Sequence, residues 1–230
     1  MHLLPEGMDV ETAALVHIAT FPLAALRKCR TELGDSVIVM GQGVLGQMAV
    51  QLAHAAGAVP VIAVDPVPEK RARALELGAD DALDPCDADF VRTVKRLTGG
   101  GARVAIEVTG LGSGLDMVLD CMARFGRVAL LGCTRSSDFT IDYYRKVHAP
   151  GITMIGAHTQ ARPREESHEG WWTERDDVQA LFRLCMAGRL PLRDLLEEVH
   201  SPLECGEVYA RLAKGGGFPV VQFDWTSLED

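Results

Sequence analysis

Residues 37–46 read VIVMGQGVLG, a short β-branched run followed by the glycine pattern G-x-G-x-x-G. The run predicts a buried strand, and Val44 to Ala56 predicts a helix, so the glycines fall in a strand-to-helix turn. In that setting Gly41 permits the tight turn, and Gly43 lacks the Cβ that would keep a pyrophosphate away from the backbone. Gly46 lets the helix pack closely on the strand. The stretch therefore predicts a dinucleotide site, although a plain turn without a ligand would use the same residues.

The cofactor is predicted from the start of the helix and from the next strand end. The free N–H groups of the first helical turn, at Val44 and Leu45, attract a phosphate. Asp65 lies 19 residues past the last glycine, where a carboxylate accepts hydrogen bonds from the adenosine ribose and repels the 2′-phosphate of NADP. The next residues, 66–68, contain no arginine, so NAD is favoured over NADP. Lys70 is either a ribose contact or a solvated surface residue.

Strand and helix patterns alternate on both sides of this turn, which predicts an α/β protein with a Rossmann fold. We expect a doubly wound parallel sheet of six strands, with helices on both faces. The expected strands are 36–40, 61–64, 82–83, 104–108, 127–131 and 153–155, and the helices between them are 44–56, 68–77, 86–97 and 113–124. Residues 1–34 form a helical lead-in, 35–157 the NAD-binding core, and 158–230 a C-terminal extension with a polar loop, helices near 176–186 and 203–214, and a terminal strand.

Two further strand ends are expected to border the cofactor, because ligands of open parallel sheets bind beyond the carboxyl ends of the strands. Val108 and Thr109 end one strand, and Leu131 and Gly132 end another. Ordinary strand-terminal turns would also explain these residues.

Composition excludes several classes of protein. The 230 residues are 47% hydrophobic and 24% charged, as in ordinary globular proteins, and the net charge of −9 argues against nucleic-acid binding. The six cysteines form no C-x-x-C pair, so reduced thiols in a cytoplasmic protein are expected. The N-terminus has no secretory pattern and no later stretch has the uninterrupted apolar length of a membrane span, so we expect no membrane association.

With these residues in place, the chain resembles the cofactor domain of the zinc-type alcohol dehydrogenases in the medium-chain dehydrogenase/reductase superfamily, which includes sorbitol and threonine dehydrogenases. The resemblance runs from Leu4 to Phe223. The segments that carry it are LPEGMDVETAAL, GDSVIVMGQGVLG, VQLAHAAGA, VIAVD, ALELGADDALD and RVALLG. It implies hydride transfer between NAD and a small-molecule alcohol or carbonyl, with the substrate oxygen on a catalytic zinc, and a homo-oligomeric complete enzyme.

The same resemblance implies that a preceding catalytic domain carries the first zinc ligands, and we expect this chain to start after it. His17 falls where relatives place a third metal ligand or its neighbour, and Thr20 falls near a proton-relaying hydroxyl. A single imidazole cannot hold catalytic zinc, which takes three protein ligands, so no metal site is expected in this chain. We therefore expect NAD binding with little or no turnover. The alternatives are a stand-alone NAD-binding sensor or partner module, and a zinc-independent reductase of the same superfamily.

The C-terminal extension carries two more expectations. By resemblance, 190–201 and the last strand lean on the catalytic domain, which predicts an exposed apolar patch in this chain. The polar loop 159–172, with Arg162, Arg164 and Trp171, is either a contact for substrate or another subunit, or a mobile surface loop.

Overall fold

Six parallel strands form the central sheet of the part of the chain that a computed structural model describes, residues 2–133, 139–215 and 219–228. Their order across the sheet is β3-β2-β1-β4-β5-β6. The bounds are β1 Val37–Met40, β2 Val61–Val64, β3 Asp81–Leu83, β4 Ala102–Glu107, β5 Met122–Leu130 and β6 Thr153–Gly156. The order reverses between β1 and β4, which confirms the predicted doubly wound Rossmann fold.

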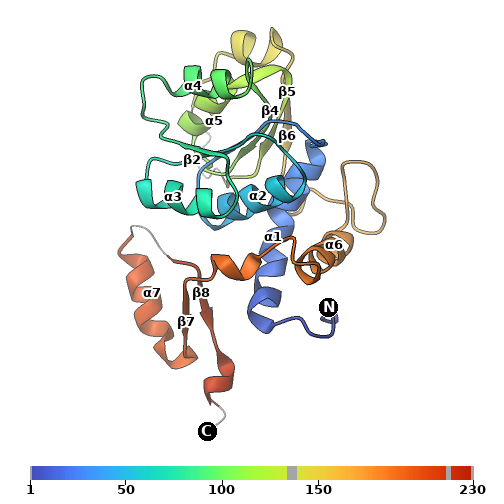
Figure 1. The fold of residues 1–230 in the computed structure, drawn as a ribbon, viewed down its shortest axis with the longest axis vertical. Coiled ribbons are helices and arrows are strands. Elements are labelled where there is room, and N and C mark those ends of the chain that lie inside the picture. The colour runs from blue at the N-terminus through green and yellow to red at the C-terminus, as the bar shows by residue number, and fades with distance from the viewer. Residues whose placement is uncertain (1, 134–138, 216–218, 229–230) are drawn as a thin grey trace.

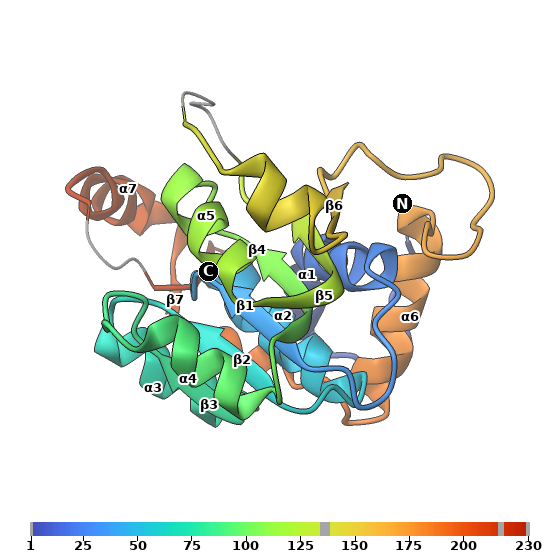
Figure 2. The same ribbon diagram turned by 90° about the horizontal axis from the view of Figure 1, so that it is seen from above.

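Helices cover both faces of this sheet (Figures 1 and 2). Residues of α1, α2, α3 and α6 share one apolar core with alternate strand residues, and residues of α4 and α5 share the other. The bounds are α1 Val10–Lys28, α2 Val44–Ala55, α3 Pro68–Glu76, α4 Phe90–Leu97, α5 Gly112–Asp120 and α6 Glu174–Met186. In β1, for example, Val37 and Val39 face the first core, and Ile38 and Met40 face the second. A strand buried on both faces reads as a continuous apolar run, which is why it could be recognised in the sequence.

Two predicted helices have different bounds in the structure. The helix expected over 86–97 begins only at Phe90, because Asp84 and Asp87 each accept a backbone N–H two residues ahead and hold turns there. The helix expected over 113–124 ends at Asp120, and β5 begins at Met122, earlier than the predicted strand. Side-chain hydrogen bonds delay the start of the first helix, and strand pairing from Met122 follows the end of the second.

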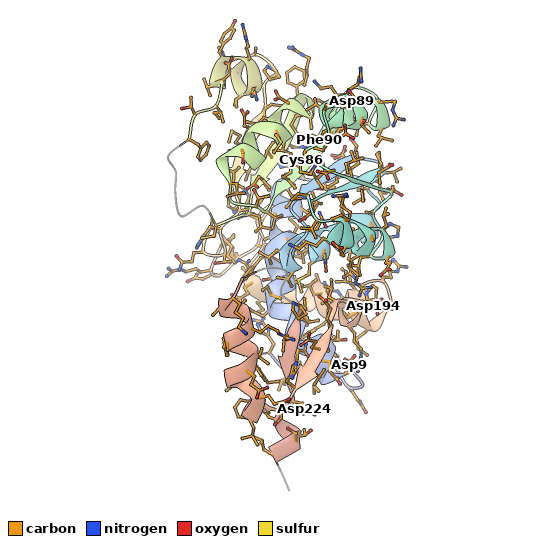
Figure 3. All side chains as sticks on the ribbon, turned by 90° about the vertical axis from the view of Figure 1, so that its left-hand side faces the viewer. Asp9, Cys86, Asp89, Phe90, Asp194 and Asp224 are labelled. Carbon is orange, nitrogen blue, oxygen red and sulfur yellow. The ribbon has the colours of Figure 1, made fainter. Side chains whose placement is uncertain are left out.

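A smaller unit follows the Rossmann body. It contains a parallel pair of strands, β7 (Glu198–His200) and β8 (Val221–Phe223), together with α7 (Cys205–Ala213) and the short helices η3 (Pro202–Glu204) and η4 (Trp225–Leu228). It projects from one end of the body in Figure 1, and Figure 3 shows Asp224 in this unit and Asp194 between it and the body. The sequence predicted β8 and α7 but not β7.

The apolar patch expected at 190–201 and the last strand is exposed only in part. Leu190, Leu192 and Leu195 are buried, because the short helix η2 (Leu192–Leu195) packs against α1 and α2. Val199, within the predicted range, is exposed, and the smaller unit also exposes Leu203, Tyr209, Leu212 and Trp225. That part of the prediction was wrong for the leucines, since helix packing on the same chain covers them.

Helix α1 is apolar, and most of its apolar side chains are buried in the core. Among the described residues it is the one helix with the length and composition to cross a membrane, but it lies in the core between α2 and α6. The end of the polar loop packs on it as well: the Arg27 guanidinium lies 3.5 Å from the centre of the Trp172 ring, and Lys28 Nζ lies 4.7 Å from that of Trp171. These two contacts attach the C-terminal end of the polar loop to the last turn of α1.

Candidate functional site

The glycine turn lies at the carboxyl end of β1, between the ends of β2 and β4. Gly41 has a φ of +98°, which favours glycine, and a Cβ there would lie 3.0 Å from the methyl carbon of Thr109. A Cβ on Gly46 would overlap the Gly41 carbonyl oxygen. These two glycines are therefore required by the turn itself.

Gly43 differs from its two neighbours. Its φ is −77°, an ordinary value, and a Cβ built on it would meet no described atom within 4 Å. It is the N-cap of α2 and has no side chain to bond the first N–H groups of that helix, including those of Val44 and Leu45. The backbone here is open to a group arriving from outside, and the helix N-terminus favours an anionic one.

Asp65 directly follows β2, and its carboxylate bonds the glycine turn that follows β1. It is 6% exposed, and its Oδ2 accepts the Gln42 N–H of the glycine turn at 2.8 Å, while Oδ1 accepts the Val67 N–H at 2.9 Å. Each carboxylate oxygen has a second lone pair for a ligand hydroxyl. The sequence placed Asp65 beside the turn, but its bond to Gln42 became visible only in the structure.

An arginine does lie at this strand end, although none was expected from residues 66–68. Arg71 Nη1 donates to the carbonyl oxygens of Asp65 (2.7 Å) and Pro66 (2.9 Å) and to Asp84 Oδ2 (3.2 Å). Arg71 lies in α3, and its side chain reaches back to the end of β2. Because Arg71 is six residues after Asp65, the residues directly after Asp65 did not indicate this contact.

Glu107 organises the strand ends on the other side of the turn. Its buried carboxylate accepts the N–H of Thr109 (2.8 Å) and of Gly110 (3.2 Å) and bonds the Thr109 hydroxyl. Its carbonyl oxygen accepts the N–H groups of Leu131 and Gly132. Burial raises the pKa of the Glu107 carboxyl, and the bonds to Thr109 and Gly110 oppose that rise. The sequence reasoning overlooked this residue; a charged side chain at the end of an apolar strand was the available signal.

Of the two expected strand ends, the one at Val108 adjoins the glycine turn and the one at Gly132 adjoins the turn after β4, and that they border the cofactor stays a prediction. The Val108 N–H donates to the carbonyl of Met40, the residue before Gly41. A Cβ on Gly132 would overlap the backbone nitrogen of Gly110, so the turns after β4 and β5 are in close contact. The turns after β4 and β5 are thus held together by the hydrogen bonds of Glu107 and by close backbone contact.

A cleft of about 700 Å³ opens beside the glycine turn. Gln42, Gly43 and Val44 line it on one side, and Lys70 and Arg73 of α3 line it on another. Glu197 and Val220, which lead into the smaller unit, are among the other lining residues. The Arg73 guanidinium also bonds the Asp194 carbonyl, which ties α3 to the segment labelled at Asp194 in Figure 3. A pocket of this size is typical of small-molecule and cofactor sites.

His17 and Thr20, carried over from the family resemblance, both lie on α1 and have structural partners within this chain. His17 is exposed, and its Nδ1 lies 3.2 Å from Glu174 Oε1. Thr20 is fully buried, and its hydroxyl donates to the His17 carbonyl at 2.7 Å. Within the described part of the chain, no three His, Cys, Asp or Glu side chains come together to hold a metal. These residues do not form a zinc site by themselves, and both assignments stay predictions.

Comparison with known proteins agrees with this geometry. The family model for zinc-binding dehydrogenases matches residues 44–171. D-guloside 3-dehydrogenase of Escherichia coli (strain K12) is 29% identical over 90% of this chain and 59% of its own length. L-threonine 3-dehydrogenase of Pyrococcus horikoshii is 29% identical over 83% of this chain and 51% of its own length. The chain thus spans little more than half the length of these curated relatives.

A solved structure shows the same fold over most of the chain. An alcohol dehydrogenase zinc-binding domain protein from Burkholderia ambifaria matches with a TM-score of 0.80 and 26% identity, covering 96% of this chain and 58% of that one. The family match runs from the first residue of α2 through the loop after β6, which is more than half of the 230 residues. The resemblance predicted from the glycine turn and its neighbouring segments is confirmed: the chain belongs to the zinc-binding dehydrogenase family.

Proposed function

We propose that this chain binds NAD and forms the cofactor part of an alcohol or polyol dehydrogenase. NAD, when bound, accepts or supplies a hydride at its nicotinamide ring. The chain's own contribution is to hold and orient that cofactor next to a small-molecule alcohol or carbonyl, a positioning role. The names of the curated relatives, which are sugar-derivative and amino-acid dehydrogenases, support a hydroxyl-bearing substrate. A cytoplasmic, homo-oligomeric enzyme remains the expectation for the complete protein.

Gly43 is the observation that carries the proposal. Gly41 and Gly46 are explained by the turn, but the ordinary φ of Gly43 and the open space around it leave no structural need for glycine. Close approach of a pyrophosphate to the backbone supplies that need. The cleft beside Gly43 has room for such a ligand.

The surrounding residues have separate roles in this proposal. The uncapped N–H groups at the start of α2 would bind the pyrophosphate, and Lys70, on the cleft wall, would add positive charge. Asp65 would accept the adenosine ribose hydroxyls with its remaining lone pairs and would repel a 2′-phosphate. The turns anchored by Glu107 would border the nicotinamide half. NAD is therefore preferred to NADP.

A Gly43→Val variant tests the proposal. The isopropyl group would occupy the open space beside the α2 N-terminus, so we expect NADH affinity to fall by at least about tenfold, since close backbone contact with the pyrophosphate is lost. NADH binding is measured by calorimetric titration, and folding by thermal melting.

Gly206→Val is the matched control. Gly206 also has open space around its Cβ position, but it lies in α7, away from the glycine turn. We expect this variant to bind NADH as the wild type does. A wild-type chain that does not bind NADH, or a Gly43→Val variant that binds it unchanged, would overturn the proposal.

A further inference from the structure

A cation, Arg71, bonds the backbone of the residue whose carboxylate is proposed to read the ribose. Arg71, whose side chain is 20% exposed, bonds the Asp65 and Pro66 carbonyl oxygens through Nη1. Guanidinium groups bind phosphates well, because they present several donors in one plane. An arginine at this strand end would by itself favour NADP, which carries its extra phosphate on the adenosine ribose.

A second carboxylate, Asp84, offsets that cation. Asp84 follows β3, the neighbour of β2 in the sheet, and its Oδ2 lies 3.2 Å from Arg71 Nη1. Its Oδ1 accepts the Cys86 N–H at 2.8 Å, which fixes the side chain in the loop where Figure 3 labels Cys86. The Arg71 guanidinium is thus paired with the Asp84 carboxylate, while the Asp65 carboxylate is bonded to backbone N–H groups.

We propose that Asp84 is a specificity-determining residue: by neutralising and holding Arg71, it prevents this arginine from recruiting a 2′-phosphate and so preserves the preference for NAD. The inference rests on the proposed NAD binding and deepens it. Asp65 acts by direct contact with the ribose, whereas Asp84 acts indirectly, by pairing with the charge of Arg71. Cofactor choice is then set by three residues on α3 and two strand ends.

Asp84→Asn is the decisive variant, because asparagine keeps the Oδ1 acceptor for Cys86 and removes both the charge and the Oδ2 acceptor that hold Arg71. We expect the affinity ratio of NADP to NAD to rise about threefold to fivefold, the size of a partly exposed charge pair. The gain should shrink with added salt, since it is electrostatic. Calorimetric titration with NAD, NADP, 5′-AMP and 2′-AMP measures it, and the gain should appear with 2′-AMP but not with 5′-AMP.

Three other variants separate this effect from a general structural one. Asp87→Asn removes the same charge three residues further along the loop, where the Asp87 carboxylate accepts the Asp89 N–H, and should leave the ratio unchanged. Arg71→Gln should shift the ratio the opposite way, further toward NAD. The double variant Arg71→Gln with Asp84→Asn should lose the gain in NADP affinity.

The outcomes are distinct for the two proposals. A wild-type chain that binds neither cofactor overturns the proposed function and this inference together. A wild-type chain that binds NAD, with an unchanged ratio in Asp84→Asn or an equal shift in Asp87→Asn, overturns the role of Asp84 alone. If Asp84→Asn melts early, its cofactor ratio is measured at a temperature at which thermal melting shows the variant to be folded, and an unchanged ratio there overturns the role of Asp84.

Discussion

Asp65 has two roles, one in binding the proposed cofactor and one in holding the glycine turn, and its position in the sequence does not separate them. Its carboxylate is placed to accept ribose hydroxyls, and it also holds the Gln42 N–H of the glycine turn. A change at this residue should therefore affect both the choice of cofactor and the shape of the turn. Two substitutions can separate these effects, because one keeps an oxygen in place and the other does not.

We expect Asp65→Asn to weaken NAD relative to NADP and to lower the melting temperature only slightly, since the amide oxygen still accepts the buried Gln42 N–H and only the partly buried Val67 N–H loses its acceptor. Asp65→Ser should shift the cofactor ratio in the same direction and also lower stability by about 1 kcal/mol, because a buried N–H loses its partner. Calorimetric titration and thermal melting measure the two effects. Equal melting of both variants would show that the bond to Gln42 contributes little.

Single residues also decide where elements begin. Asp84 and Asp87 delay the start of α4, and the same Asp84 carboxylate reaches Arg71. A sequence reading can recognise aspartate as a turn former, but it cannot tell which of several nearby aspartates takes the backbone bond. The later start of α4 leaves Asp84 on a fixed loop beside β2.

At the scale of elements, α1 and α6 are joined through a buried ion pair. Asp177, fully buried in the first turn of α6, has its Oδ1 2.8 Å from Arg27 Nε of α1. Arg27 in turn lies over Trp172 at the end of the polar loop. Burial raises the pKa of the Asp177 carboxyl from 3.8 to about 6, although the Arg27 charge opposes the rise.

This pKa shift has a definite sign in stability. The folded chain holds the Asp177 proton more tightly than the unfolded chain does, so its contribution to stability is complete below about pH 4 and is lost as the pH rises through about 6. We expect the stability of wild type relative to Asp177→Asn to fall, on the order of 1 to 2 kcal/mol, between pH 4.5 and 7.5. Denaturant unfolding across this range measures it.

Asp176 provides the opposite sign as a control. A hydrogen bond from Ser167 holds the pKa of the Asp176 carboxyl below its usual value, so wild type should gain relative to Asp176→Asn as the pH rises. If the two variants show parallel pH dependence, the buried pair does not set the stability of the α1–α6 contact.

At the scale of the whole molecule, the cleft is built from four separate segments of the chain. Gly43 and Lys70 come from the Rossmann body, and Glu197 and Val220 come from the segments that lead into the β7–β8 unit. The Gln222 side chain also donates to the Glu11 carbonyl at 2.7 Å, which joins β8 to α1. The smaller unit thereby contributes to the wall of the proposed cofactor site.

A ligand in this cleft should stabilise the fold as a whole. We expect NAD at a hundred times its dissociation constant to raise the free energy of unfolding by about 2.7 kcal/mol, because it binds only the folded chain. Thermal melting with NAD, and with NADP as the weaker ligand, measures this effect. Equal stabilisation by both would contradict the proposed preference.

The same purified chain should show little or no alcohol oxidation when NAD and zinc are supplied. Its described residues do not bring three metal ligands together, and His17 is engaged with Glu174. The assay follows NADH absorbance with several alcohols. Robust turnover would show that the chain holds catalytic groups that we have not assigned.

Much of the fold and part of the site follow from the sequence alone. Strands buried on both faces appear as apolar runs, and the glycine pattern is a local consequence of a tight turn, so β1, α2, β2 and the positions of Gly43 and Asp65 could be predicted. Local backbone geometry and short-range periodicity carry that information. The six-stranded arrangement then follows from alternation of strands and helices.

Only the tertiary structure decided which distant groups meet. Leu190 and Leu195 are buried because η2 packs on α1 and α2, and the short strand β7 exists because β8 pairs with it. Glu107 ties two turns together, and Arg71 and Asp84 meet beside Asp65. Burial, strand pairing and charge neutralisation depend on neighbours in space, and these are fixed only when the whole chain has packed.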